Sequence, residues 1–273
     1  MPDKSGRSGM SGELPKPLEL PDYAVKNRAV WTAANAAYAG PRARDSWAKK
    51  DIHWGVFKVP EDEIHALPDV HGLDVIELGC GTAYFGCWLK KRGAARVVGI
   101  DITPAQLETA RELNAEFRMG LEFIEANAED VPLPDASFDL AFSEYGASIW
   151  CDPYLWIPEA VRLLRPGGEL LFLQSSTLQM LCSPDESRVA ERLIHPQKGM
   201  HRFDWTAEDE LSTEFHISGS EMFRLLKSLG MDVVDFRELY APDDAVDHSY
   251  YSYVPVAWAK KWPMEEIWRS RKR

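Results

Sequence analysis

Long apolar runs, excess positive charge and metal-binding cysteine patterns are all missing from this sequence. The first twenty residues, MPDKSGRSGMSGELPKPLEL, contain no apolar stretch of the kind that a signal peptide or a membrane span requires. The 273 residues carry 31 Lys and Arg against 43 Asp and Glu, a formal net charge of −12. This balance removes a general attraction to phosphate backbones and anionic membranes. We therefore expect a cytoplasmic protein with neither nucleic acid nor membrane as a partner.

The cysteines are few and are not spaced as metal ligands. Cys80, Cys87, Cys151 and Cys182 form no CxxC pair and have no companion histidines at the spacing of a zinc site. We expect reduced thiols and no bound metal. With 45% hydrophobic residues, the chain is large enough for one sizeable core. We predict a disordered tail over residues 1–20 and a single domain over 21–273.

Short apolar runs alternate with segments of helical period from Leu73 onward. This alternation is typical of a parallel sheet covered by helices, so we predict an α/β fold with a Rossmann-like doubly wound sheet. Thr103 and Pro104 suit the start of a helix, and Gly230 suits the end of one. We predict strands over 73–78, 96–101, 121–126, 138–143, 169–174 and 231–239, and helices over 84–92, 104–117 and 218–230, with another helix ending near Arg165.

Two segments interrupt this rhythm. Residues 21–70 precede the first strand, and their aromatic residues suggest two or three short helices, which would form a cap. Residues 175–217 follow the fifth strand with mixed Pro, His, charged and aromatic residues, and we interpret them as a lid insertion. The core would then span 71–174 and a C-terminal helix and strands 218–273, with the final SRKR run (270–273) as a solvated end.

A glycine turn follows the first predicted strand in VIELGCGTAYFG. Gly79 and Gly81 would let a ligand touch the backbone, because a Cβ atom would block it. The GxGxxG pattern of dinucleotide enzymes fails here, since its third glycine would fall on Tyr84. Asp101 ends the second strand, 20 residues beyond Gly81, where a carboxylate can accept hydrogen bonds from both ribose hydroxyls. Together these residues indicate a bound nucleoside.

Four motifs in order resemble the class I S-adenosylmethionine-dependent methyltransferases, in particular the group of ubiquinone and menaquinone C-methyltransferases. They are the glycine turn after Glu77, Asp101, the stretch EANAEDVPLPDASFDLAFS and the run LLRPGG, and they cover roughly residues 70–175. The resemblance implies S-adenosylmethionine as the cofactor. Family members often have Asp at the position of Asn127 and a third small residue such as glycine at that of Ala83.

The resemblance also implies a set of cofactor-binding residues. The backbone near Gly79 and Gly81 would meet the methionine part, Asp101 the ribose, and Ile102 the adenine ring. Asn127, whose side-chain carbonyl can bond the adenine amino group, would border the adenine edge. The full predicted set is Glu77, Gly79, Cys80, Gly81, Asp101, Ile102, Gln106, Asn127, Ala128, Glu129 and Ser143.

The stretch GASIWCDPYLW invites comparison with the Asp-Pro-Pro-Tyr signature of enzymes that methylate bases in DNA. In those enzymes the signature directly follows the fourth strand, whereas Asp152 comes nine residues after Ser143. An Asp followed by Pro is an ordinary helix start. We therefore predict that Asp152 caps a helix and takes no part in the chemistry.

Methyl transfer from a sulfonium needs a nucleophile held in line and water excluded, and a base helps when the nucleophile must lose a proton. Our candidates for catalysis are Glu144, His53 and Tyr145, with Glu144 first because the sheet positions it. His195, His201 and His216 in the insertion are further bases to consider, although any one of them is more simply a surface or structural imidazole.

Aromatic residues of the cap, insertion and tail suggest a closed pocket for a small, flat, apolar molecule. We predict that Trp54, Trp150, Tyr154 and Trp205 bind this substrate. The function we expect is therefore methyl transfer from S-adenosylmethionine to a small aromatic or apolar molecule by in-line displacement. A cofactor-binding regulatory protein of the same fold, without catalysis, is the alternative. The aromatic residues that suggest the pocket are Trp31, Trp54, Trp150, Phe203, Trp205, Tyr250, Tyr251 and Tyr253.

Overall fold

A seven-stranded sheet forms the centre of the protein in this computed structural model, which describes residues 18–185, 188–206, 211–247 and 251–273. The strand order is β10-β11-β7-β6-β3-β4-β5, and β11 is antiparallel to both of its neighbours while the other six strands run in the same direction. This confirms the predicted doubly wound sheet. Its strands are β3 (Asp74–Leu78), β4 (Arg96–Asp101), β5 (Glu122–Glu125), β6 (Phe138–Glu144), β7 (Leu164–Ser175), β10 (Met231–Leu239) and β11 (Glu265–Lys272).

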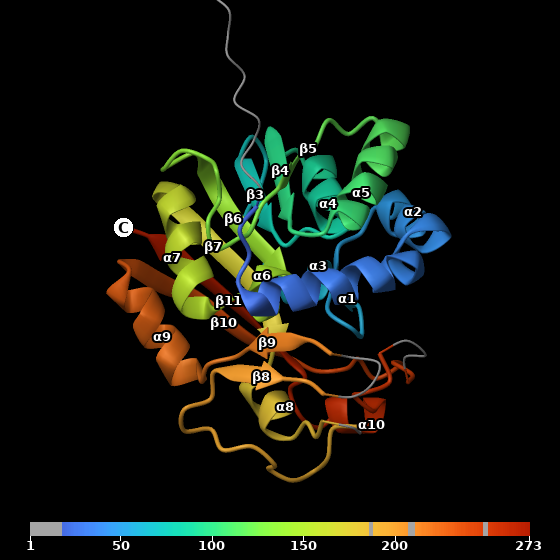
Figure 1. Ribbon diagram of the computed structural model, residues 1–273, viewed down its shortest axis with the longest axis vertical. Coiled ribbons are helices and arrows are strands. Elements are labelled where there is room, and N and C mark those ends of the chain that lie inside the picture. The colour runs from blue at the N-terminus through green and yellow to red at the C-terminus, as the bar shows by residue number, and fades with distance from the viewer. Residues whose placement is uncertain (1–17, 186–187, 207–210, 248–250) are drawn as a thin grey trace, which may run out of the picture.

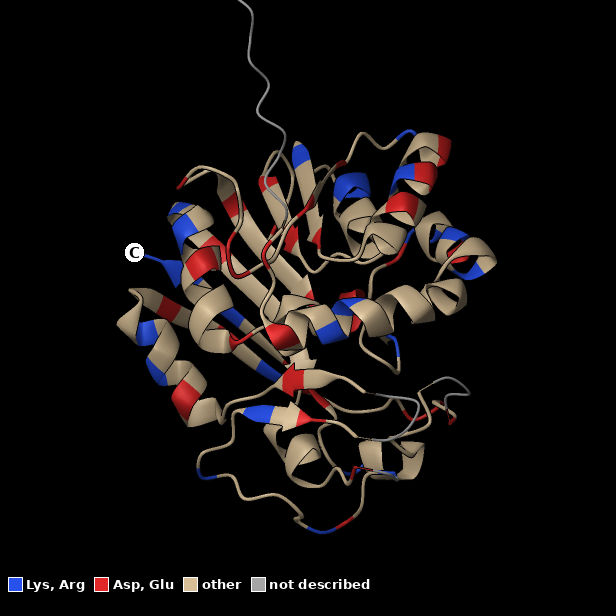
Figure 2. Cartoon of the chain, in the orientation of Figure 1, with Lys and Arg blue, Asp and Glu red and all other residues tan. Residues whose placement is uncertain are grey.

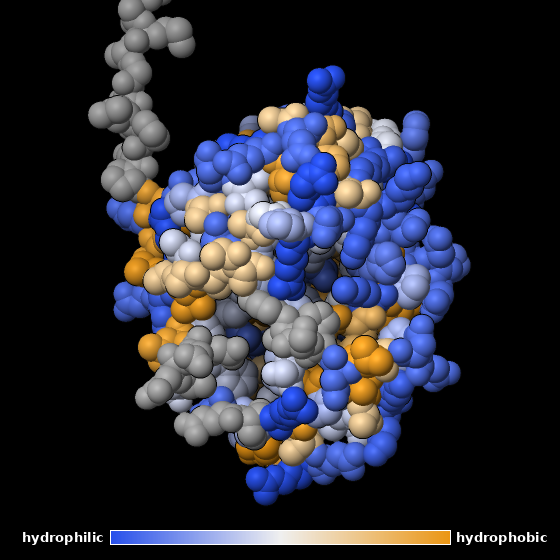
Figure 3. All heavy atoms as spheres, turned by 90° about the vertical axis from the view of Figure 1, so that its right-hand side faces the viewer, coloured by the Kyte–Doolittle hydropathy of each residue, from blue (hydrophilic) through white to orange (hydrophobic). Residues whose placement is uncertain are grey.

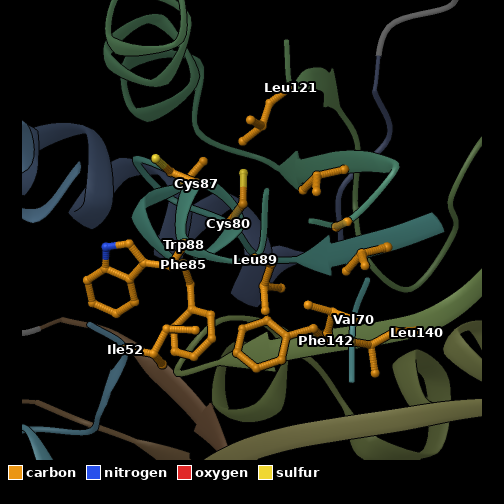
Figure 4. Close-up of a cluster of buried hydrophobic side chains, with 14 of the residues drawn as sticks. Ile52, Val70, Cys80, Phe85, Cys87, Trp88, Leu89, Leu121, Leu140 and Phe142 are labelled. Atoms are coloured by element: carbon orange, nitrogen blue, oxygen red, sulfur yellow. The ribbon is translucent and has the colours of Figure 1, made fainter. Parts of the chain in front are cut away.

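Helices cover both faces of this sheet (Figure 1). On one face α4 and α5 pack apolar side chains such as Phe85 and Leu107 on the sheet, in the cluster that Figure 4 shows in part. On the other face α7 and α9 contribute Trp156 and Met222. The helices are α1 (Asp22–Tyr38), α2 (Gly40–Ala48), α3 (Glu61–Ile64), α4 (Tyr84–Lys91), α5 (Pro104–Phe117), α6 (Ala147–Trp150), α7 (Pro153–Leu163), α8 (Thr177–Leu181), α9 (Gly219–Ser228) and α10 (Val256–Ala259).

The six predicted strands and the helices α4, α5, α7 and α9 form where the apolar periodicity placed them, within a few residues. Pro104 opens α5, although Thr103 makes no side-chain capping bond, and Gly230 follows α9 with φ +78°. The prediction for the last residues was wrong. Ser270 to Lys272 belong to β11, which inserts between β7 and β10, and Arg269 and Arg271 pair with Glu169 on β7. The sequence suggested a solvated end because the last residues of this strand are mostly charged.

The segment ahead of the sheet contains more than short helices. Helix α1 has 17 residues and lies across the carboxyl ends of the parallel strands (Figure 1). A small hairpin of β1 (His53–Trp54) and β2 (Val59–Pro60) follows α2. Most of the predicted tail, residues 1–17, lies outside the described residues.

The predicted insertion contains α8 and a two-stranded antiparallel sheet, β8 (Arg202–Asp204) and β9 (Thr213–Phe215). In Figure 1 these elements lie on the far side of α1 from the main sheet. Figure 2 shows residues of both charge signs on the outer helices α5, α7 and α9. Among the described residues, no helix combines the length and the apolar composition needed to cross a lipid bilayer.

Candidate active site

The turn between β3 and α4 brings three left-handed backbone positions together. Gly79 has φ +75°, Gly81 has φ +52° and Ala83 has φ +57°. A Cβ on Gly79 would lie 2.6 Å from the Cα of Gly146, so the turn after β6 passes directly over this glycine. Ala83 occupies a conformation that suits glycine better than a residue with a Cβ. The tight turn therefore leaves its backbone open to the space above it.

Asp101 is anchored at the end of β4 by two backbone donors. Gly81 N–H donates to its Oδ2 and Thr103 N–H donates to its Oδ1, both at 2.8 Å. Burial raises the pKa of this carboxyl above its usual value, and the two backbone donors oppose that rise. Asp101 also lines a cavity, so this fixed carboxylate is placed to accept from a ligand hydroxyl as well. A carboxylate held in this way is an acceptor for the hydroxyl groups of a ribose.

A cavity of about 1840 Å³ opens above these residues, at the carboxyl ends of β4, β5 and β6. Its position agrees with the place where open α/β sheets bind ligands. Figure 3 faces one side of the region, where hydrophilic and hydrophobic residues both surround a central hollow. The cavity wall includes eight of the predicted cofactor-binding residues: Gly79, Cys80, Gly81, Asp101, Ile102, Gln106, Asn127 and Ala128.

The other three predicted cofactor residues lie behind this wall and fix it in place. Glu77 is buried under α4, where it accepts from the N–H of Gly86 at 3.0 Å. Ser143 donates to the carbonyl of Leu78 at 2.8 Å. Glu129 accepts from the Asn127 amide at 3.1 Å and from the N–H of Asp152 at 2.8 Å. These positions suit support of the turn and of Asn127 more directly than contact with a ligand.

All three candidates for catalysis line the same cavity. Glu144 accepts from the hydroxyl of Tyr84 at 2.5 Å and from the N–H of Gly55 at 3.3 Å, and burial raises its pKa. His53 also lines the wall, with its Nδ1 3.0 Å from the carbonyl of Asp51. Tyr84, which sequence reasoning missed, thus shares a short hydrogen bond with the first candidate base.

Tyr145 stands in a left-handed conformation with φ +52° and donates its hydroxyl to Glu265 at 2.6 Å. Glu265 also accepts from the N–H of Val56 at 2.7 Å. Burial, reinforced by the charge of Glu144, raises the pKa of Glu265 to about 7. No motif in the sequence predicted a role for Glu265. The one available signal was that two acidic residues, Glu265 and Glu266, interrupt an apolar run between Met264 and Ile267.

The predicted substrate residues divide into two pairs. Trp150 and Trp205 line the cavity, and Trp150 packs edge-on against Trp31 of α1 with ring centroids 5.3 Å apart. Trp54 is fully buried in the core, where its indole N–H donates to Glu61 at 2.6 Å. Tyr154 is 46% exposed and is not part of the cavity wall. Tyr38, Tyr84, Tyr251 and Tyr253 also line the cavity, whereas Tyr250 lies outside the described residues.

The three histidines of the insertion are all engaged away from this cavity. His195 Nε2 lies 2.7 Å from the carbonyl of Ser183, and His216 Nε2 lies 2.8 Å from Glu214. His201 Nε2 lies 3.0 Å from Asp152, and none of the three is among the residues that line the large cavity. Each imidazole therefore has a structural partner.

Asp152 caps helix α7, as predicted. Its carboxylate accepts from the N–H of Tyr154 at 2.9 Å, and Pro153 occupies the first helical position. Strand β6 ends at Glu144, so Asp152 lies well beyond the strand end. Within the described ranges, no group of three His, Cys, Asp or Glu side chains is arranged to hold a metal ion.

Comparisons with known proteins agree with this geometry. Residues 76–172 match a protein family described as a methyltransferase domain. A malonyl-acyl-carrier-protein O-methyltransferase of Serratia marcescens is 37% identical over 113 residues, which is 40% of this chain and 42% of that protein. A demethylmenaquinone methyltransferase of Deinococcus radiodurans is 34% identical over 101 residues, which is 37% of this chain and 42% of that protein. The chain thus spans about two fifths of the length of these curated relatives.

A solved structure described as an S-adenosylmethionine-dependent methyltransferase from Mesorhizobium loti superposes with a TM-score of 0.64 at 23% identity. The superposition covers 80% of this chain and 99% of that protein. It extends the likeness of the fold well beyond the 97 residues, 76–172, that match the family.

Proposed function

We propose that this chain, a class I S-adenosylmethionine-dependent methyltransferase by its fold and its domain, methylates a small aromatic or apolar molecule. One observation carries the proposal. A single cavity joins the glycine turn and Asp101 to the pair of Tyr84 and Glu144, with aromatic side chains around them. A cofactor bound at the first part would present its methyl group toward a substrate held in the second.

The residues present fit the cofactor. Gly79, Cys80 and Gly81 present their turn to the cavity, and Asp101 lines the same cavity with both carboxylate oxygens fixed by backbone donors. Ile102 and Ala128 supply apolar wall on either side of Asn127, whose side-chain oxygen already accepts from the N–H of Glu129 at 3.2 Å. When bound, S-adenosylmethionine supplies an electrophilic methyl group.

Tyr84 and Glu144 are the groups that would take a proton from a substrate hydroxyl. Tyr84 donates its own proton to Glu144, so a lone pair of its phenol oxygen is available to a substrate O–H. As the substrate proton passes to Tyr84, the Tyr84 proton passes to Glu144. The raised pKa of Glu144 makes it a stronger base than an ordinary carboxylate, which favours this transfer near neutral pH.

Helix α1 and the 175–217 segment would together exclude water from the reaction. The Asn27 amide and the backbone of Thr213 exchange two hydrogen bonds of 2.8 Å, and Asn27 is buried. Tyr23 of the same helix donates to Glu129 at 2.6 Å, beside the cofactor wall. The two segments that we interpret as cap and lid are thus joined to each other and to the core, and we propose that they close over the ligands as one cover.

Calorimetry with S-adenosylhomocysteine tests the proposal. The wild-type protein is expected to bind it, and Asp101→Ala is expected to weaken binding at least about tenfold, because hydrogen bonds to a charged group contribute about 1.5–3 kcal/mol. Asp69→Ala is the matched control, since Asp69 accepts only from the N–H of His71 in an exposed loop. Folded wild-type protein that gives no binding heat contradicts the proposal. Binding without methyl transfer to any small-molecule pool would favour a regulatory protein of the same fold.

A further inference from the structure

Two lysines lie on one wall of the cavity in a chain that is otherwise strongly acidic. Lys49 directly follows α2, Lys58 ends the turn of the β1–β2 hairpin, and both line the cavity together with His53. Within the described part of the chain, neither ammonium group forms an ion pair with a carboxylate. Lys49 is half-buried and Lys58 is exposed at the edge of the cavity, so both are accessible to a ligand from solvent.

The turn that carries Lys58 is fixed firmly to the floor of the site. Val56 N–H donates to Glu265 at 2.7 Å, and Gly55 N–H donates to Glu144 at 3.3 Å. A Cβ on Gly55 would overlap the Glu265 carboxylate, so only glycine fits this contact. Lys58 itself has φ +55°, a conformation that lysine rarely adopts. The fold therefore holds a lysine where glycine or asparagine would be less strained.

The surroundings of Lys49 disfavour its charged form, and an anion nearby would favour it. Burial lowers the pKa of Lys49, repulsion from Lys58 lowers it further, and Asp45 opposes both effects. Asp45 also lines the cavity, and its charge favours the ammonium form of Lys49. An anion placed near the two lysines would offset their repulsion and would oppose the lowering of the Lys49 pKa.

We propose that Lys49 and Lys58 form an anion subsite, so that the substrate of the proposed methyl transfer is a small organic acid bearing a carboxylate or a phosphate. This inference rests on the proposed function, because it assumes that the cavity binds a methyl-accepting substrate. Gly55 connects this subsite to the base, because the same turn carries Lys58 and contacts Glu144. An acidic substrate anchored at the lysines would direct its reacting atom toward Tyr84, and the repulsion between its acid group and Glu144 would disfavour the reversed orientation.

Lysine labelling with an acetylating reagent, read by mass spectrometry, tests this subsite directly. Benzoate and phenyl phosphate are expected to slow acetylation of Lys49 and Lys58 at least about threefold, whereas benzamide, the neutral isostere of benzoate, has no such effect. Lys50 is exposed and does not line the cavity, so its labelling rate is the internal control. Inorganic phosphate distinguishes binding of any anion from binding of an organic acid. If phosphate protects the two lysines as strongly as phenyl phosphate does, the result contradicts a subsite for an organic acid.

Variants give the second readout. The double variant Lys49→Met, Lys58→Met keeps the apolar stems and is expected to weaken benzoate binding about fivefold by calorimetry, while Lys50→Met leaves it unchanged. The affinity for S-adenosylhomocysteine is expected to stay within about twofold in all variants, which also reports correct folding. Equal protection by benzoate and benzamide, or equal loss in Lys50→Met, overturns the anion subsite. Absence of S-adenosylhomocysteine binding in the wild type would instead overturn the proposed function.

Discussion

The two halves of the cavity are built in different ways. The cofactor half is made by consecutive strand ends and turns, and its central hydrogen bond, from Gly81 to Asp101, joins residues 20 positions apart. The half that we propose for the substrate is assembled from distant segments: Tyr145 and Glu265 are 120 positions apart, and Asn27 and Thr213 are 186 apart. The first half is fixed by local backbone geometry and the second by long-range packing. A cofactor shared by many enzymes can thus keep its site while the substrate pocket changes.

The sharpest way to break the cofactor half alone is to add one methyl group. Gly79→Ala would place a Cβ 2.6 Å from the backbone of Gly146 and Ala147, where nothing flexible can move aside. We expect loss of detectable S-adenosylhomocysteine binding and a fall in unfolding free energy of about 3 kcal/mol or more. Urea unfolding and calorimetry on the same preparation measure both effects.

Gly72→Ala is the matched control for this variant. Gly72 has φ +78°, close to the +75° of Gly79, but no atom lies within 4 Å of the position that its Cβ would take, and it is remote from the cavity wall. Gly72→Ala should lower the unfolding free energy by about 1 kcal/mol, the cost of a left-handed backbone conformation, and should leave the cofactor affinity unchanged. Equal effects of the two substitutions would show that backbone strain, and not the crossing of the two turns, makes Gly79 necessary.

The same contrast explains how far the sequence could predict the site. Gly79, Gly81 and Asp101 follow from local rules about turns and strand ends, and the structure has them on one wall of the cavity. Glu265 could not be found in this way, because its partners Tyr145 and Val56 become neighbours only when β11 inserts into the sheet. The prediction that Trp54 binds substrate has the same weakness. Aromatic composition does not distinguish an indole in the core, where Trp54 lies, from one that lines a pocket.

A change of pH probes the substrate half. The pKa of Glu265 is raised from 4.5 to about 7, so between these values the folded protein holds a proton that the unfolded chain has released. Stability is therefore lost as the pH rises through this window. At about 1.4 kcal/mol per pKa unit, the loss between pH 5 and pH 8 is about 2.5 kcal/mol. Glu265→Gln stays neutral, so we expect the wild type to lose that much stability relative to the variant between the two pH values.

Urea unfolding of both proteins at pH 5 and pH 8 measures this difference. Glu122→Gln is the control, because Glu122 is exposed and its bond to Arg96 lowers its pKa, so its contribution is constant over this range. The affinity for S-adenosylhomocysteine is expected to be the same in Glu265→Gln and the wild type at either pH, apart from any titration of Asp101 common to both. A pH-independent difference between wild type and Glu265→Gln would mean that Glu265 is ionised throughout.

The smallest expected effect lies outside the cavity wall, at the start of α7. Asp152 accepts from the N–H of Tyr154 at 2.9 Å and from His201 of the 175–217 segment at 3.0 Å. Asn keeps the capping oxygen, so Asp152→Asn should change the unfolding free energy by less than about 0.5 kcal/mol, whereas Asp152→Ala should cost about 1 kcal/mol. Both variants should bind S-adenosylhomocysteine like the wild type, because the side chain serves the helix and not the ligand. An Asp152→Asn protein that binds the cofactor normally but no longer methylates an identified substrate would assign this carboxylate to the chemistry after all, and would move the boundary between the two halves to α7.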